Sequence, residues 1–128
     1  MQQSRTFLVI ASIFGLTGVA LGSFGAHCLK STISSDLLLA FEMGVRYQMY
    51  HTFALYVVSW FLHSRHTKKL VLSAWFFVSG VILFSGSLYL LAITGLRSFG
   101  MITPLGGMLL LAGWVMLMLG FLDKKSIQ

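Results

Sequence analysis

Four long apolar stretches, separated by short polar segments, run along the chain at residues 7–26, 45–62, 70–94 and 102–122. At about 1.5 Å of rise per residue, each stretch is close to or above the length that crosses the roughly 30 Å hydrocarbon core of a bilayer as an α-helix. The pattern predicts an all-α membrane protein with a single domain, a bundle of four transmembrane helices.

Local sequence signals predict where two of these helices begin. Ser34 or Ser35 has the side chain of an N-cap for a second helix that starts near Leu37, about two turns before its apolar stretch. Thr103 followed by Pro104 predicts an N-cap and first helical residue for the fourth helix. The expected helices therefore cover about residues 7–26, 37–62, 70–94 and 102–122.

Composition supports a membrane environment and limits the chain to one domain. The 128 residues are 57% hydrophobic and 9% charged, with a mean hydropathy of +0.88, whereas soluble domains carry about 25% charged residues. The net charge of +6 comes from basic residues at the predicted helix ends. This placement favours orientation in the bilayer over binding of nucleic acid.

Basic residues are distributed unevenly between the two membrane sides. Because cytoplasmic loops carry an excess of Lys and Arg, the distribution predicts a multi-pass protein of the cell (inner) membrane with both termini in the cytoplasm. It also argues against a dual-topology dimer. The predicted cytoplasmic side holds Arg5, Arg65, Lys68, Lys69, Lys124 and Lys125, and the outer side holds Lys30 and Arg97.

The sequence contains no arrangement that predicts catalysis or a cofactor. Cys28 is the single cysteine, so an intrachain disulfide is excluded, and the metal-binding spacings CxxC, HExxH and HxxxH do not occur. His27 and His51 fall at different predicted depths, which argues against a pair of haem ligands. Ser85 and Ser87 lack an evident base. We therefore expect neither enzymatic activity nor a bound cofactor.

Small residues recur on three of the predicted helices at spacings that place them on one face, with serines at 73 and 87 flanking the glycine of the third helix. In lipid, such small residues let helices approach closely, because association there depends on packing. We expect packing within the chain, with dimerisation of two chains as the alternative. The glycines among them are Gly15, Gly18, Gly22 and Gly25 on the first helix, Gly80 on the third, and Gly106 and Gly113 on the fourth.

The second helix carries the segment FEMGVRYQMYH, which is unusually polar for this chain. At about 100° per residue, its polar side chains fan across half of the helix, with only Gln48 on the far side. Counted from the cytoplasmic boundary, His51 lies roughly 16 Å deep and Arg46 roughly 24 Å. The polar residues of the segment are Glu42, Arg46, Tyr47, Gln48, Tyr50 and His51.

Two interpretations of this polar face stay open. In the first, Glu42 and Arg46 form an i,i+4 ion pair and the face holds the helices in register. In the second, the face lines a polar pocket open to the outer leaflet, where it binds an anionic headgroup or a quinone-like ring. His27 and Arg97, at the outer ends of other helices, would complete that pocket.

Four segments resemble a known family. The strings SFGAHCL, FEMGVRYQMYH, FSGSLYLLAITG and ITPLGG are similar to those of small uncharacterised inner-membrane proteins of the YgdD and YwdK type, whose animal relative is transmembrane protein 256. The resemblance covers all four helices, with Cys28 standing where the family is expected to have glycine. It implies a four-helix multi-pass membrane protein without an established activity.

These observations favour a non-enzymatic function in the bilayer. The first interpretation is a small accessory subunit that packs against a membrane-protein partner or forms a homo-oligomer. A lipid- or quinone-binding module is the alternative. A small-solute or ion transporter ranks third, because no acidic residue lies in the inner half of the predicted spans to complete a path.

Overall fold

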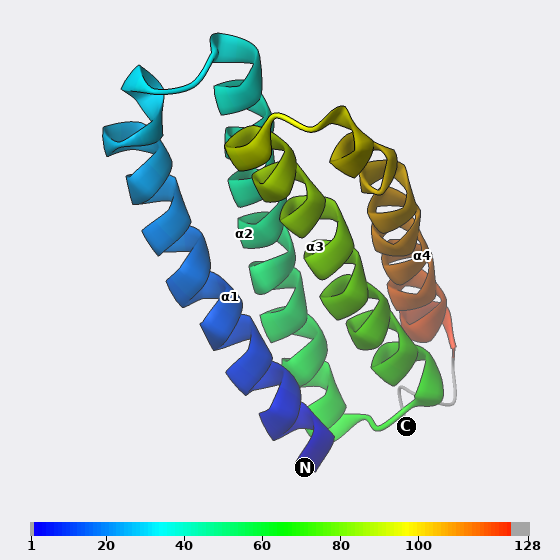
Figure 1. Cartoon of the computed structure of the whole chain (residues 1–128). Helices are drawn as coiled ribbons and strands as arrows, with labels where there is room; N and C mark the ends of the chain where they lie inside the picture. The colour runs from blue at the N-terminus through cyan, green and yellow to red at the C-terminus, as the bar shows by residue number, and fades with distance from the viewer. Residues whose placement is uncertain (1, 124–128) are drawn as a thin grey trace.

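The computed structural model describes residues 2–123, and all of their regular secondary structure is helical (Figure 1). Short links make consecutive long helices antiparallel. The elements are α1 (Gln2–His27), the 3₁₀ turn η1 (Leu29–Ser31), α2 (Ser35–Ser64), α3 (Lys68–Thr94), the 3₁₀ turn η2 (Arg97–Met101) and α4 (Thr103–Leu122).

The ends of α2 and α3 follow from their sequence. Ser34 is the N-cap of α2, since its hydroxyl accepts a hydrogen bond from the amide of Leu37 at 3.3 Å, so the prediction of a cap at this position is confirmed. Thr67 caps α3 in the same manner. Gly95 ends α3 with φ of 73°, a left-handed conformation that glycine adopts without steric cost.

The beginning of α4 differs from its prediction. Ile102 occupies the N-cap position, and Thr103 is already helical without capping the helix. The hydroxyl of Thr103 instead lies 2.6 Å from that of Ser87 on α3. The η2 turn leads directly into α4, so the threonine is used to join two helices rather than to cap one.

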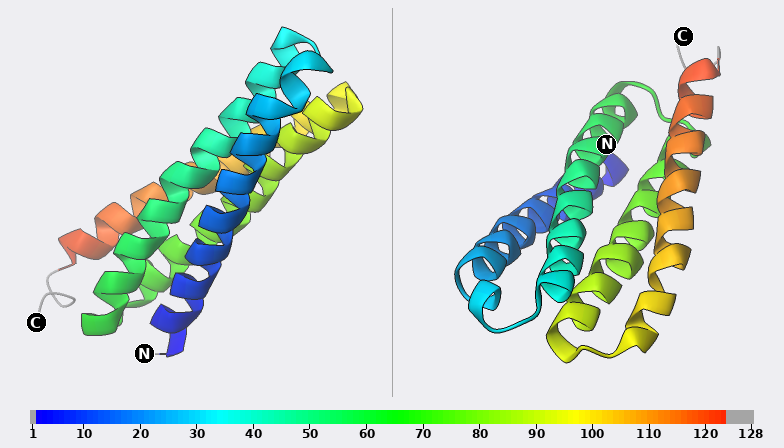
Figure 2. Two further views of the ribbon diagram at one scale, coloured as in Figure 1. Left: turned by 90° about the vertical axis from the view of Figure 1, so that its left-hand side faces the viewer. Right: turned by 90° about the horizontal axis from the view of Figure 1, so that it is seen from above.

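The helices α2 and α3 form a central pair, with α1 and α4 on opposite sides of it (Figure 2). α1 packs mainly on α2, and α4 packs mainly on α3. Near the N-terminus of the chain, Phe7 meets Trp75 of α3 with ring centroids 5.0 Å apart. Because α1 and α4 do not pack together, the arrangement is more open than the square bundle that four antiparallel helices suggest.

Glycines on α1 face α2 along the length of their contact. At Gly18 and Gly25, Met49 and Phe41 of α2 occupy the space that a Cβ atom would enter. At Gly15 and Gly22 a Cβ atom would make ordinary contact with side chains of α2. The α1 stripe is therefore occupied by packing within the chain. On α4, Gly106 lies directly against the backbone of Phe84 on α3, so a close approach of these two helices depends on it.

Much of the outer surface is apolar. Large side chains such as Leu16, Trp60 and Met108 are 73%, 76% and 68% exposed, which a protein in water rarely shows over so wide an area. Three segments are long and apolar enough to cross a membrane: Gln2–Ser31, Lys68–Thr94 and Arg97–Leu122. α2 has the length but is not among them, because its first half carries the polar segment.

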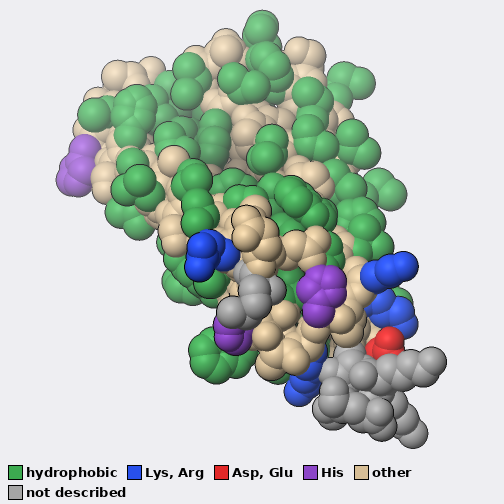
Figure 3. Space-filling model, turned by 90° about the horizontal axis from the view of Figure 1, so that it is seen from below, with side chains coloured by type: hydrophobic (Ala, Val, Ile, Leu, Met, Phe, Trp, Pro, Cys, Tyr) green, Lys and Arg blue, Asp and Glu red, His purple; other side chains and the backbone are tan. Residues whose placement is uncertain are grey.

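Basic side chains gather at the end of the molecule that holds the N-terminus and the α2–α3 turn. Figure 3 shows Lys, Arg and His side chains around this end, with hydrophobic side chains over most of the remaining visible surface. We call it the basic end and the opposite one, with η1 and η2, the link end. The side chains at the basic end include Arg5, His63, Arg65, His66, Lys68 and Lys69.

Candidate functional site

A groove opens between α1 and α2 near the link end, with a volume of about 210 Å³. Gly22 and Gly25 bound it on the α1 side, and at Gly25 the ring of Phe41 already occupies the space that a Cβ atom would need. Phe41 and Val45 form its apolar part. The remaining two lining residues, Glu42 and Arg46, carry opposite charges.

Glu42 and Arg46 are both exposed, and they do not form the ion pair expected from their spacing. Between side chains of residues 2–123, the ion pair present joins Lys69 to Asp123 at 3.9 Å, at the basic end. The side chain of neither Glu42 nor Arg46 makes a hydrogen bond within this part of the chain. Both charges are therefore open to a molecule that enters the groove from outside.

Gln48 joins three helices from a buried position, only 4% exposed. Its amide nitrogen donates to the carbonyl of Phe14 and to the hydroxyl of Thr17 on α1, both at 2.8 Å. Its amide oxygen accepts a hydrogen bond from the hydroxyl of Tyr89 on α3 at 2.6 Å. The residue that the sequence placed on the far side of the polar face is thus the centre of the interior hydrogen bonding.

His51 joins α2 to α4. The indole nitrogen of Trp114 lies 3.0 Å from Nε2 of His51, and Nδ1 of His51 lies 2.7 Å from the carbonyl of Tyr47. Because an indole N–H can only donate, Nε2 is the acceptor and Nδ1 carries the proton. Both ring nitrogens are engaged, so His51 acts here as a structural contact and has no free nitrogen for a ligand.

A second groove, of about 370 Å³, lies between α2 and α4. Tyr47, His51 and Trp114 are its polar residues, and the rest of its lining is Phe84, Pro104, Gly107, Met108, Leu110 and Leu111. No charged residue lines it. Apart from these three side chains, its lining is nonpolar.

The eight residues expected to line one polar pocket fall in separate places. Glu42 and Arg46 line the α1–α2 groove, Tyr47 and His51 the α2–α4 groove, and Tyr50 is 57% exposed on the outer face. His27 ends α1, whereas Arg97 begins η2 against α3 and α4 (Figure 1). The single pocket of the sequence-based hypothesis is therefore not formed.

The rotation of α2 explains this division. Residues two positions apart point about 200° away from one another on a helix. Because Gln48 faces the junction of α1, α2 and α3, Arg46 must face away from it. Tyr50 lies on the same outward side, whereas His51 turns back toward α4.

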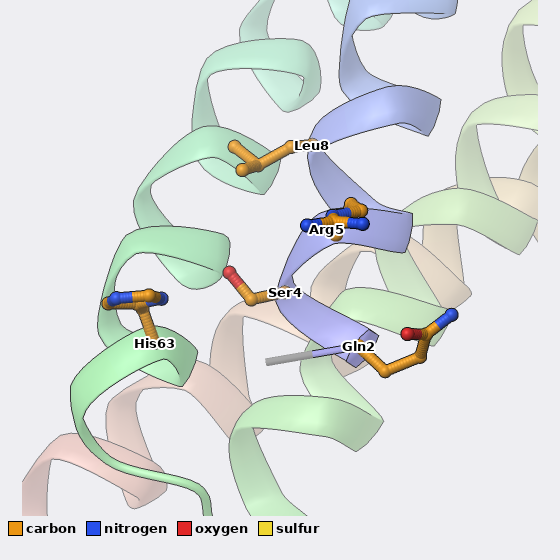
Figure 4. Close-up of a pocket in the computed structure, with 5 residues that line it drawn as sticks. All are labelled: Gln2, Ser4, Arg5, Leu8 and His63. Atoms are coloured by element: carbon orange, nitrogen blue, oxygen red, sulfur yellow. The ribbon is translucent and has the colours of Figure 1, made fainter.

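A further pocket, not predicted from the sequence, lies at the basic end between α1 and α2 (Figure 4). Gln2, Ser4, Arg5 and Leu8 of α1 and His63 of α2 line about 250 Å³. Ser4 points toward α2 and donates to the carbonyl of Ser59 at 2.8 Å. The sequence signal that could have indicated this pocket is a pair of basic residues at adjacent helix ends. Arg5 lies in the first turn of α1, and His63 lies in the last turn of its antiparallel neighbour α2.

Within residues 2–123, no group of three His, Cys, Asp or Glu side chains is arranged to hold a metal ion. Cys28 is exposed at the link end and has no cysteine partner.

Helical structure throughout the described residues, several apolar helices and an apolar outer surface define a multi-pass membrane protein of the all-α class. Residues 21–107 match a family described as "Protein of unknown function (DUF423)", and the chain belongs to this family.

Relatives with known names agree with this class. The chain is 39% identical to the UPF0382 membrane protein YwdK of Bacillus subtilis over 88% of its length and 93% of the relative's. It is 38% identical to the UPF0382 inner membrane protein YgdD of Escherichia coli K12 over 95% and 93%. No solved structure matches the chain. The resemblance found in the sequence is confirmed, and the protein is placed in the cell (inner) membrane.

Proposed function

We propose that all four long helices cross the membrane and that the basic end faces the cytoplasm. α2 has 30 residues, which at about 1.5 Å per residue is longer than the hydrocarbon core. It packs between α1 and α3, both apolar enough to span. A bilayer that contains α1 and α3 therefore also surrounds α2. The excess of basic residues at one end supports a cytoplasmic location of both termini.

Cys28 allows a direct test of this topology. It is the single cysteine of the chain and is exposed at the link end. We expect a membrane-impermeant maleimide to label it in intact cells.

A matched variant carries Cys28→Ser together with His66→Cys, which moves the thiol to the α2–α3 turn. This variant should be labelled only after the membrane is permeabilised. Equal labelling of both proteins in intact cells would contradict the crossing of α2, because it would place the two turns on one side.

We infer that the protein is a non-enzymatic lipid-binding module whose site is the α1–α2 groove. The observation that carries this proposal is the pair of exposed, mutually unpaired charges, Glu42 and Arg46, beside a groove bounded by glycine backbone. Charged side chains at membrane depth normally have a partner. A phospholipid headgroup provides such a partner for Glu42 and Arg46, at the level where the polar part of the bilayer begins.

A quinone fits this groove less well than a headgroup does. Two of the residues that line the groove, Glu42 and Arg46, are charged. These two opposite charges have no counterpart on a neutral quinone ring. The α2–α4 groove is larger, but His51 has no free ring nitrogen there to bind a quinone carbonyl.

Replacing Arg46 should reduce retained lipid. Arg46→Ala removes a charge-assisted contact to phosphate worth about 1.5–3 kcal/mol, so we expect lipid occupancy to fall about tenfold or more. Native mass spectrometry of protein released from mild detergent measures this occupancy. Arg97→Ala is the matched control, because Arg97 is an exposed arginine at the same end but outside the groove. An equal loss in both variants, or none in Arg46→Ala, contradicts the proposal.

The accessory-subunit interpretation is the second candidate. It is favoured by Tyr50, which is 57% exposed and whose hydroxyl bonds no other residue of the described chain. A membrane-protein partner or a second copy would supply the missing acceptor. Transport of a small solute or ion, the third interpretation, is less favoured because hydrogen bonds of Gln48 close the interior between three helices.

A further inference from the structure

We propose that the α1–α2 groove recognises the zwitterionic headgroup of an aminophospholipid, with the phosphate on Arg46 and the primary ammonium on Glu42. This inference rests on the lipid-binding function proposed above and adds to it the chemical class of the headgroup. The sign, the order and the spacing of the two charges support this assignment.

The two charges follow one another along the axis of α2. Glu42 and Arg46 are four residues apart and line the same groove, so their backbone positions differ by one turn, about 6 Å. They do not neutralise each other as an ion pair. The groove therefore offers separate positive and negative contacts within reach of one small dipolar group.

The order of the charges matches the orientation of a phospholipid. Arg46 is the residue deeper in the bilayer, since α2 begins at the link end with Ser35 and runs toward the basic end. In a phospholipid the phosphate is attached next to the glycerol and the acyl chains, and the amine lies beyond it, nearer water. The cation of the protein therefore meets the phosphate and its anion meets the amine.

Glu42 also makes the groove selective. A headgroup with a net negative charge and no amine would bring its own charge beside the carboxylate of Glu42, and like charges in contact disfavour binding. An ammonium group has three N–H donors for a carboxylate, and hydrogen bonds between charged groups are stronger than neutral ones. Arg46 alone would favour anionic lipids. Glu42 shifts this preference toward a zwitterionic headgroup.

The shape of the groove limits it to a headgroup. The groove is small, about 210 Å³. On the side of the groove toward the basic end, the contact between α1 and α2 is closed, because Met49 and Gln48 fill the space beside Gly18. The acyl chains consequently stay on the apolar outer surface, where α1 exposes Leu16 and Val19.

Competition between two lipids tests the selectivity. The purified protein is mixed in detergent with equal amounts of phosphatidylethanolamine and phosphatidylglycerol with identical acyl chains, and bound lipid is counted by native mass spectrometry. For the unaltered protein we expect phosphatidylethanolamine to exceed phosphatidylglycerol at least about threefold. In Glu42→Gln, which keeps the shape but removes the charge, the ratio should fall to about one or below.

Asp36→Asn is the matched control. Asp36 is an exposed carboxylate in the first turn of the same helix and lies outside the groove, so its loss should leave the ratio unchanged. The side chain of Glu42 is exposed and makes no hydrogen bond or ion pair among residues 2–123. Circular dichroism and gel filtration of both variants confirm that they are folded.

The outcomes separate this inference from the function on which it rests. Two results would overturn the preference for a zwitterionic headgroup and leave Arg46-dependent lipid binding standing. One is phosphatidylglycerol bound as well as phosphatidylethanolamine or better. The other is a lipid ratio that Glu42→Gln does not change. Absence of retained lipid, with a second copy or another membrane protein attached instead, overturns both the headgroup and the lipid-binding function.

Discussion

Gly106→Ala should destabilise the protein by roughly 1–3 kcal/mol, the usual cost of forcing extra atoms into a packed contact. A Cβ at this position would lie closer than 3.0 Å to backbone atoms of Phe84 and Leu83 on α3. Backbone cannot change rotamer as a side chain does, so α4 must move away from α3. The contact between these helices is the most extensive in the molecule, and the displacement affects all of it.

Thermal unfolding in detergent, followed by circular dichroism, measures the loss. Gly86→Ala is the control, because Gly86 is also helical and a Cβ there meets nothing within 4 Å. Alanine favours the helix over glycine by up to about 1 kcal/mol, so this variant should be equal to the unaltered protein or slightly more stable. Similar melting temperatures for both variants would show that the α3–α4 approach tolerates a side chain.

Gln48→Leu should cost about 2–4 kcal/mol. The change keeps the size of the side chain but removes hydrogen bonds to Phe14, Thr17 and Tyr89. Hydrogen bonds between membrane helices contribute about 0.6 kcal/mol on average and up to about 1.7 kcal/mol. The half-buried hydroxyl of Tyr89, left without its acceptor on Gln48, adds a penalty toward the lower end of about 1–3 kcal/mol.

A double-mutant cycle separates the hydrogen bonds from general packing. Tyr89→Phe removes one bond by itself, and in the Gln48→Leu background it removes the hydroxyl that has lost its acceptor. We therefore expect Tyr89→Phe to destabilise the unaltered protein but to be neutral or stabilising in the Gln48→Leu variant. Strictly additive melting data would mean that the bond between Gln48 and Tyr89 contributes little.

The large features of the fold follow from the sequence. Apolar stretches long enough to cross a bilayer predict the helices, and Ser34 marks the start of α2 because its side chain can satisfy a free amide. Spacings of three and four residues place the glycines of α1 on one face, which is the face that meets α2. These signals are local, or depend only on the period of a helix.

The candidate site was predictable only in part. The sequence indicated that the polar segment of α2 is unusual and that Glu42 and Arg46 lie near its outer end. It also grouped them with Tyr50, His51 and Arg97, which the structure places elsewhere. The i,i+4 spacing allowed an ion pair between Glu42 and Arg46, but both side chains turn outward beside the glycines of α1.

Which polar residues face inward was decided by the tertiary structure. The sequence fixes the angles between Arg46, Gln48 and His51 on α2, but the rotation of the whole helix depends on where α1, α3 and α4 pack. In water, hydrophobic periodicity supplies that rotation because the core is apolar and the solvent is not. In a bilayer both sides are apolar, so the rotation is set by the close approach at the glycines and by the hydrogen bonds of Gln48 and His51.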